Sequence, residues 1–90
     1  MLEKQIEKAV CDYAKTKGFL VYKFTSPNRA AVPDRMFIRN GVVSFIEFKA
    51  EGQKATPAQH REHHRLQREG MSVFMVDNIG WGKTVVDSLP

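Results

Sequence analysis

The stretch DRMFIRNGVVSFIEFK, residues 34–49, decides the fold because it encodes a complete β-hairpin. Asn40-Gly41 separates two runs rich in aromatic and β-branched residues, and Asn-Gly is the strongest short signal for a type I′ hairpin turn. The runs predict strands over residues 34–39 and 42–49. Apolar side chains occur on both faces of the second run, with Ile46 and Phe48 on one face and Val43 and Phe45 on the other. We therefore expect helices to cover both faces of the hairpin.

A two-residue turn also fixes the register of the hairpin. Arg39 then pairs with Val42, and Asp34 falls directly opposite Glu47. Directly opposed Cβ atoms lie about 4.5–5.5 Å apart on one face of a sheet. Lys49 is two residues beyond Glu47 and projects from the same face. Two carboxylates and one amine are therefore expected to converge at one end of the hairpin.

The cluster of Asp34, Glu47 and Lys49 has two interpretations. In the first it is a surface ion cluster in which Lys49 neutralises the carboxylates. Because directly opposed like charges are destabilising, the second interpretation places a divalent cation between them. Mg²⁺ prefers one or two carboxylates together with water and phosphate oxygens, and a metal beside a lysine can activate water and stabilise charge on an attacked phosphate. Spacing alone leaves both interpretations open.

Further elements are expected on both sides of the hairpin. In chain order they are a helix over 2–17, a strand over 19–24, a loop over 25–29, the two hairpin strands, a polar loop over 51–54, a helix capped by Thr56 with Pro57 in its first turn and ending near Glu69, a strand over 72–76 and a last helix over 79–89. Gly80 and Gly82 count against the last helix. The order α-β-β-β-α-β is typical of a mixed sheet flanked by helices. Because no linker or repeat is present, residues 1–90 are expected to form one domain.

Length, composition and charge narrow the functional classes. The chain has 90 residues, 42% hydrophobic and 27% charged, which excludes a disordered tail. No apolar run approaches the ~20 residues of a membrane span, and the first residues lack the apolar core of a signal peptide. The single cysteine, Cys11, cannot form an internal disulfide, so we expect a cytoplasmic setting. The net charge of +4 is compatible with a nucleic-acid partner.

Several short motifs give the chain a family resemblance. Pro33-Asp34, followed by Glu47-Phe48-Lys49, resembles the PD-(D/E)XK nuclease signature. More narrowly, the chain is similar to the stand-alone phage and bacterial type of the virus-type replication-repair nuclease family, VRR-NUC. The similar positions run from Glu3 and Ile6 through 23–27, 32–35, 45–50, Gln59 and Leu66 to Gly70. The resemblance implies a restriction-endonuclease-like α/β fold with an αβββαβ core, in a bacterial or phage-infected cell.

The resemblance also implies an activity and roles for residues. The activity is Mg²⁺- or Mn²⁺-dependent hydrolysis of DNA phosphodiester bonds, in repair or phage replication. Asp34 and Glu47 match the metal-binding acids, Phe48 would add its backbone carbonyl, Lys49 matches the catalytic lysine and Gln59 matches a glutamine that contacts the site. One position departs from the family pattern. Ala31 stands where the family usually has glycine, which puts the approach of backbone to DNA in doubt but leaves the ligand assignment unchanged.

An acid on the first helix is also implied, and two residues are candidates. On a helical wheel, Glu3 lies about 60° and Glu7 about 100° from the inward-facing Ile6. Glu3 also matches the family position, so it is the predicted catalytic acid. The alternative is that Glu3 is an exposed first-turn residue favoured by the helix dipole.

Basic residues predict where DNA binds. Lys23, Arg29, Arg35 and Lys54 are the predicted DNA-binding residues. The helix expected after residue 56 carries His60 and His64, which have the spacing of a metal pair. Because it also carries Arg61, Arg65 and Arg68, which repel cations, a solvated or DNA-facing helix is the favoured interpretation. His63, on the Gln59–Leu66 face, is either a polar residue near the site or a half-buried one.

The expected partners are DNA and a second copy of the chain. Stand-alone relatives resemble junction-resolving enzymes, and a chain this small has little surface with which to recognise branched DNA alone. Apolar surface left on the hairpin would be buried most simply in a two-fold dimer, so a homodimer acting on four-way junctions is predicted. A monomer that nicks DNA without structural preference is the alternative state. A non-catalytic DNA-binding or assembly module with a structural acid cluster is the alternative function.

Overall fold

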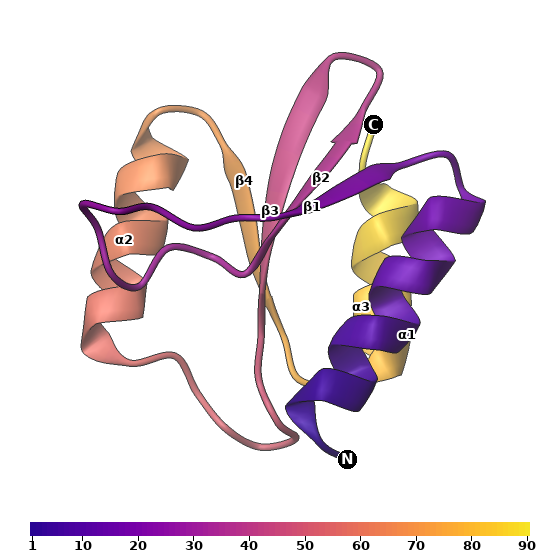
Figure 1. The fold of residues 1–90 in the computed structure, drawn as a ribbon, viewed down its shortest axis with the longest axis horizontal. Helices are drawn as coiled ribbons and strands as arrows, with labels where there is room; N and C mark the ends of the chain where they lie inside the picture. Colours follow the sequence, from indigo (N-terminus) through magenta and orange to yellow (C-terminus); the bar gives the residue numbers. More distant parts are fainter.

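The computed structural model describes residues 1–90 as three helices and one four-stranded sheet (Figure 1). The elements are α1 (Glu3–Thr16), β1 (Leu20–Lys23), β2 (Arg35–Arg39), β3 (Val42–Phe48), α2 (Pro57–Arg68), β4 (Ser72–Val76) and α3 (Ile79–Ser88). The sheet order is β1-β2-β3-β4, with two antiparallel pairings followed by a parallel one. The predicted element order and mixed sheet are confirmed. No helix is long and apolar enough to cross a membrane.

The central hairpin has the predicted register. Arg39 pairs with Val42 and Arg35 pairs with Ile46. Asn40 and Gly41 have φ angles of 54° and 76°. Positive φ at both central residues is what a type I′ turn requires, and asparagine and glycine tolerate it best. The turn therefore sets which residues of the two strands lie side by side.

One face of the sheet is sealed by α1 and α3, which lie together on the same side (Figure 1). The core on this face consists mainly of fully buried apolar side chains, among them Ile6, Val10, Phe37, Ile46, Phe48, Val76 and Val86. Gly82, which counted against the last helix, permits its close approach. A Cβ at Gly82 would lie 2.4 Å from Val10 Cγ2 and 3.0 Å from Val76 Cγ1. The Asn78 side chain caps α3 by accepting from Trp81 N at 2.7 Å.

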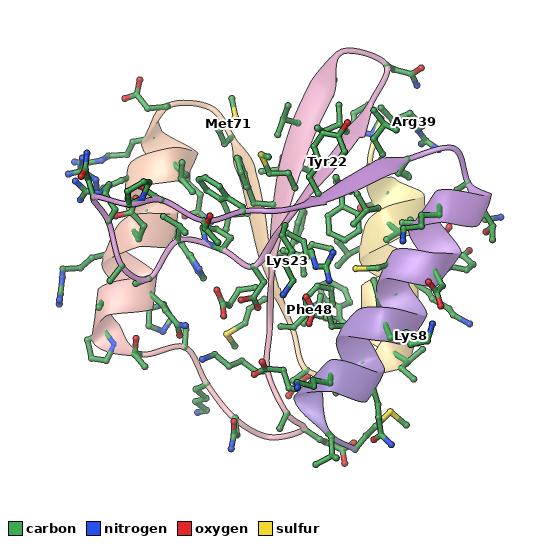
Figure 2. All side chains as sticks on the ribbon, viewed as in Figure 1. Lys8, Tyr22, Lys23, Arg39, Phe48 and Met71 are labelled. Atoms are coloured by element: carbon green, nitrogen blue, oxygen red, sulfur yellow. The ribbon has the colours of Figure 1, made fainter.

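The opposite face is only partly covered, by α2 alone. Helices were expected over both faces of the hairpin, and α2 does lie on this face, but it leaves part of the apolar surface uncovered. α2 lies mainly over β4, and the strand pairings place apolar residues of β1, β2 and β3 in rows on the same face; Met71 directly precedes β4. We call this surface the open sheet face; its residues are Leu20, Tyr22, Met36, Ile38, Val43 and Met71. Leu20 is 55% and Tyr22 52% exposed, and Tyr22 and Met71 lie toward the same end of the sheet (Figure 2).

Candidate active site

Asp34 and Glu47 lie together on the sheet face that α2 partly covers, near the end of β3. Phe24 N donates to Asp34 O at 3.0 Å, which extends the β1–β2 ladder to the residue before β2. Phe48 N donates to Asp34 Oδ2 at 2.7 Å and holds the carboxylate against the end of β3. The Glu47 side chain is only 4% exposed. The two predicted metal-binding acids are therefore brought together by the hairpin register and by one backbone hydrogen bond.

The environment of Asp34 opposes its negative charge. Burial is the main cause that raises the pKa of Asp34 to about 6; the Phe48 N–H lowers it, and the neighbouring carboxylates of Glu47 and Glu7 raise it further. Phe24 contributes to the burial because it pairs with Asp34 and packs against Phe45 at 5.3 Å between ring centroids. The site therefore concentrates acids in a poorly solvated position.

Gln59 is oriented toward Glu47 by the first turn of α2. Thr56 Oγ1 accepts from Gln59 N at 3.2 Å, and Gln59 Oε1 accepts from Thr56 N at 2.9 Å, which is a reciprocal capping box. The remaining amide nitrogen, Gln59 Nε2, donates to Glu47 Oε2 at 3.2 Å. The predicted contact of Gln59 with the site is present. The Thr56 cap was predicted from the sequence, but the reciprocal role of Gln59 was not, although Thr-x-x-Gln is a capping-box pattern.

His63 is a site residue whose role the sequence left open. It lies one turn after Gln59, and its Nε2 is 3.8 Å from Glu47 Oε1. Both atoms are buried, and neither has a hydrogen-bond partner. Buried polar atoms without partners are rare, so these two atoms are a feature of the site that the protein's own hydrogen bonds do not explain.

Lys49 follows the same strand geometry as Glu47. Its backbone N–H donates to Val76 O at 2.9 Å, so the β3–β4 ladder continues to this residue. Its side chain therefore lies on the face of Glu47. Phe48 lies between them, and its N–H points toward Asp34. Because the N–H and C=O of one strand residue point toward the same neighbour, the Phe48 carbonyl is also directed to the Asp34 side.

The structure brings Glu7, rather than the predicted Glu3, beside the site. Glu7 is half-buried; its Oε2 accepts from Arg35 Nε at 2.7 Å, and it lies near enough to raise the pKa of Asp34. Glu3 is exposed at the first residue of α1, and burial along this helix begins only at Ile6. The helical wheel gives only the direction of a side chain around the axis of α1. It favoured Glu3 because it contains no information on position along that axis.

The four predicted DNA-binding residues have different surroundings. Lys23 and Lys54 are exposed. Arg35 is paired with Glu7, and Arg29 Nε lies 3.0 Å from Glu62 Oε1, whose side chain is 10% exposed. The second pair ties the loop between β1 and β2 onto α2, across which the loop passes in Figure 1. Arg29 and Arg35 therefore carry partly neutralised charge, whereas Lys23 and Lys54 do not.

Ala31 lies in the same loop and has an unusual backbone. Its φ is +68°, in the left-handed region that favours glycine. This is the position at which the sequence departs from the glycine of the family pattern, and glycine adopts this conformation without strain. Because alanine has a Cβ, this backbone conformation is strained at Ala31.

The donor set at the site suits a hard divalent cation. Asp34, Glu47 and the Phe48 carbonyl supply oxygen atoms, and no group of three or more His, Cys, Asp or Glu side chains is positioned to hold a metal. Few protein oxygens, completed by water and substrate, are what Mg²⁺ prefers, whereas a structural Zn²⁺ takes four protein ligands. The crowded carboxylates and the partnerless Glu47 Oε1 fit such an ion.

Comparisons with known proteins bear on the whole chain. No family model matches the sequence. The chain is 44% identical over 77 residues to "Putative nuclease p44" of Acyrthosiphon pisum secondary endosymbiont phage 1, covering 84% of this chain and 83% of the phage protein.

Two solved structures share the fold. One, described as a VRR_NUC domain, has a TM-score of 0.88 at 29% identity and covers 98% of this chain and 97% of its own. The other, a VRR_NUC domain protein, has a TM-score of 0.81 at 20% identity over 97% of this chain and 86% of its own, and it supports the fold alone. The fold expected from the sequence is confirmed.

Proposed function

The chain belongs to the VRR-NUC nuclease family, and from this premise we propose that it is a Mg²⁺- or Mn²⁺-dependent DNA endonuclease whose active site is formed by Asp34, Glu47 and Lys49. The observation that carries the proposal is the adjacency of two carboxylates in a poorly solvated position, where the pKa of Asp34 is raised and Glu47 Oε1 has no partner. A protein that only binds a polyanion has no use for two acids directed at it.

The cation would be held by Asp34, Glu47 and the backbone carbonyl of Phe48. When bound, it supplies Lewis-acid activation of water and stabilisation of charge on the attacked phosphate. The Phe48 N–H fixes the Asp34 carboxylate, and the capping box of α2 fixes the Gln59 amide that donates to Glu47. The two ligating side chains are thus held by backbone and by a neighbouring amide before substrate arrives.

Lys49 and Glu7 complete the site. The Lys49 ammonium, on the same face as Glu47, orients the attacking water and stabilises charge on the phosphate oxygens. Glu7 replaces Glu3 as the acid of the first helix. Its bond to Arg35 Nε holds the guanidinium near Glu7 and Asp34, where the positive charge moderates the repulsion between the acids.

Metal binding tests the site directly. Calorimetric titration with Mn²⁺ should give heat for the wild type and none for Asp34→Ala, because the variant lacks one of two carboxylate ligands. Metal should also raise the unfolding temperature of the wild type alone, since a ligand that binds only the folded state stabilises it. Equal Mn²⁺ binding by both proteins would remove the proposed site. Labelled duplex, flap and four-way-junction DNA, each with and without Mg²⁺, then tests the activity.

The open sheet face supports the proposed homodimer. Six apolar side chains form rows on it, and Leu20 and Tyr22 are more than half exposed. Exposed apolar residues that gather in one patch often mark a protein–protein contact. A second copy is the occupant we propose, because a two-fold axis covers the patch with an identical one. The same axis presents two sites to two symmetry-related strands, which paired cuts at a four-way junction require.

Two measurements separate the dimer from the junction preference. Light scattering at micromolar concentration should give twice the monomer mass, and Tyr22→Lys should reduce it to the monomer. Leu2→Lys is the matched control, since Leu2 is 69% exposed at the N-cap of α1, away from the open sheet face. Competition between four-way and linear DNA then tests selectivity. A monomer mass for the wild type removes the dimer, and equal cutting of both DNAs removes the junction preference.

A further inference from the structure

The arginines of this chain fall into two groups by what their guanidinium groups contact. Arg35 is bonded to Glu7, Arg29 to Glu62, and Arg39 donates to the backbone carbonyls of Lys17, Leu89 and Pro90. In contrast, Arg61 and Arg68 make no ion pair or hydrogen bond with the protein, and Arg65 has only a contact of 3.8 Å to Glu62. The arginines without strong partners are therefore the three on α2.

These three residues form one stripe on the exposed side of the helix. Arg61, Arg65 and Arg68 are four and three residues apart, so they lie one above another. All three are exposed, and nitrogen-bearing side chains extend from α2 away from the sheet in Figure 2. Arg61 and Arg65 also line a hollow of about 350 Å³ with Arg29, between α2 and the loop after β1. We call Arg61, Arg65 and Arg68 the arginine stripe.

Stability does not account for the arginine stripe. Like charges three or four residues apart weaken a helix by roughly 0.2–0.5 kcal/mol per pair, and the stripe contains two such pairs. Glu62 offsets part of this, but its carboxylate is shared with Arg29. The stripe also buries no apolar surface against the sheet, because the inward side of α2 is formed by Gln59, Glu62, His63 and Leu66. Unused guanidinium donors on a free surface favour an external anionic partner.

We propose that the arginine stripe binds the phosphate backbone of a duplex DNA arm that leads away from the active site, an inference that rests on the proposed nuclease function. A guanidinium presents a planar fork of donors that matches two phosphate oxygens. Arg65 meets Glu62 through Nε, which leaves its terminal nitrogens available. The stripe has no Phe, Tyr or Trp on which single-stranded bases could stack, so it contacts backbone and not bases.

The position of the stripe fits DNA that already occupies the site. Gln59, whose amide contacts Glu47, lies on the same helix. At 1.5 Å per residue, the stripe begins about 3 Å and ends about 14 Å further along α2. Phosphates of one strand are spaced about 3.4 Å apart along a duplex axis. If the duplex axis runs along α2, the stripe reaches phosphates roughly one to four base pairs from the bond that is cut.

The test compares two triple variants that remove the same charge. Arg61→Gln/Arg65→Gln/Arg68→Gln deletes the stripe, and Lys15→Gln/Lys17→Gln/Lys83→Gln removes three exposed lysines from α1, α3 and the turn after α1. Anisotropy of a labelled duplex is measured in EDTA between about 50 and 200 mM salt. The stripe variant should lose about 2–3 units of the slope of log K against log salt, since each phosphate contact contributes about 0.9. The lysine variant should lose less than about one.

Hydrolysis of a nitrophenyl phosphodiester with Mn²⁺ separates this proposal from the proposed function. The substrate is too small to extend from the active site to the arginine stripe, so the stripe variant should cleave it at the wild-type rate. That result would also demonstrate an intact fold. If the stripe variant keeps the wild-type salt slope, the arginine stripe does not bind DNA phosphates, whether or not hydrolysis persists. If the wild type hydrolyses no substrate, the proposed nuclease function is wrong. The salt dependence of DNA binding by the two triple variants then still decides whether the arginine stripe binds phosphate. Tighter competition by duplex RNA than by duplex DNA overturns the choice of DNA.

Discussion

The two faces of the sheet differ in how completely helices cover them and in the side chains that they carry. On the side of α1 and α3, side chains from two helices and three strands are fully buried, and a glycine at position 82 removes the last obstacle to close packing. On the side of α2, one helix stands over part of the sheet, acids are crowded beside a partnerless histidine nitrogen, and apolar residues are exposed. The difference between the faces is that one buries the apolar core, whereas the other carries closely spaced acids and exposed apolar side chains.

The largest expected effect is on the sealed face. Phe37 is fully buried and meets the edge of Phe19 at 6.4 Å between ring centroids. Phe37→Ala should lower the free energy of unfolding by about 3–5 kcal/mol, since it leaves a cavity in a small core. On the open sheet face, Tyr22→Ala should cost less than about 1 kcal/mol in the monomer. Urea denaturation of the two variants checks the contrast, and equal losses would contradict it.

The second effect concerns activity alone. Lys49→Met retains the aliphatic stem and removes the ammonium, so cleavage of DNA should fall by at least about 100-fold because stabilisation of the phosphate charge is lost. Binding to duplex in EDTA should change by no more than one phosphate contact. Lys54→Met is the matched control, an exposed lysine in the loop before α2. Cleavage at the wild-type rate by Lys49→Met would end the assignment.

The third effect is a pH dependence of stability without metal. Burial raises the pKa of Asp34 in the folded protein to about 6, from the ordinary aspartate value of 3.8. Between these values the folded state binds more protons than the unfolded state, so its stability falls as pH rises from about 4 to about 6. A fully shielded carboxyl would change the free energy of unfolding by about 1.4 kcal/mol per pH unit. Asp34 is partly exposed and therefore screened by water, so the slope should be smaller than that.

Asp34→Asn isolates that contribution. An amide oxygen can still accept from Phe48 N, but the residue no longer titrates, so the slope of the wild type minus that of the variant belongs to position 34. The variant should be the more stable protein at neutral pH in EDTA and should lose the stabilisation by Mn²⁺. Parallel pH profiles for the two proteins in urea would refute this account of the acid pair.

The smallest effect tests strain in the loop over α2. Ala31→Gly should stabilise the protein by about 0.5–1 kcal/mol, since glycine avoids the cost of about 1–2 kcal/mol for a left-handed alanine and loses part of the gain as backbone entropy. Ala30→Gly, next to it and without a positive φ, should destabilise the protein. Thermal unfolding of both variants gives the two signs, and a loss of stability in both would show that Ala31 is not strained.

Much of the fold was predictable because its signals are local. Asn40-Gly41 fixed the turn, the alternating runs fixed the strands, and the turn fixed which residues are opposed. The strand over 72–76 and the helix cap at Thr56 were also predicted at their observed positions. The last helix was harder, because Gly82 lowers intrinsic helix propensity and its benefit comes from Val10 and Val76, which are distant in sequence.

The amino-acid sequence by itself determined the hairpin register, and with it the meeting of Asp34 and Glu47 on one face. Only the tertiary structure decided that Glu7 stands beside them, that His63 meets Glu47, that Arg29 binds Glu62, and that α2 leaves part of the sheet open. The physical reason is the range of the interactions. Turn geometry and side-chain alternation act between near neighbours, whereas the placement of a helix along a sheet depends on the packing of the whole core.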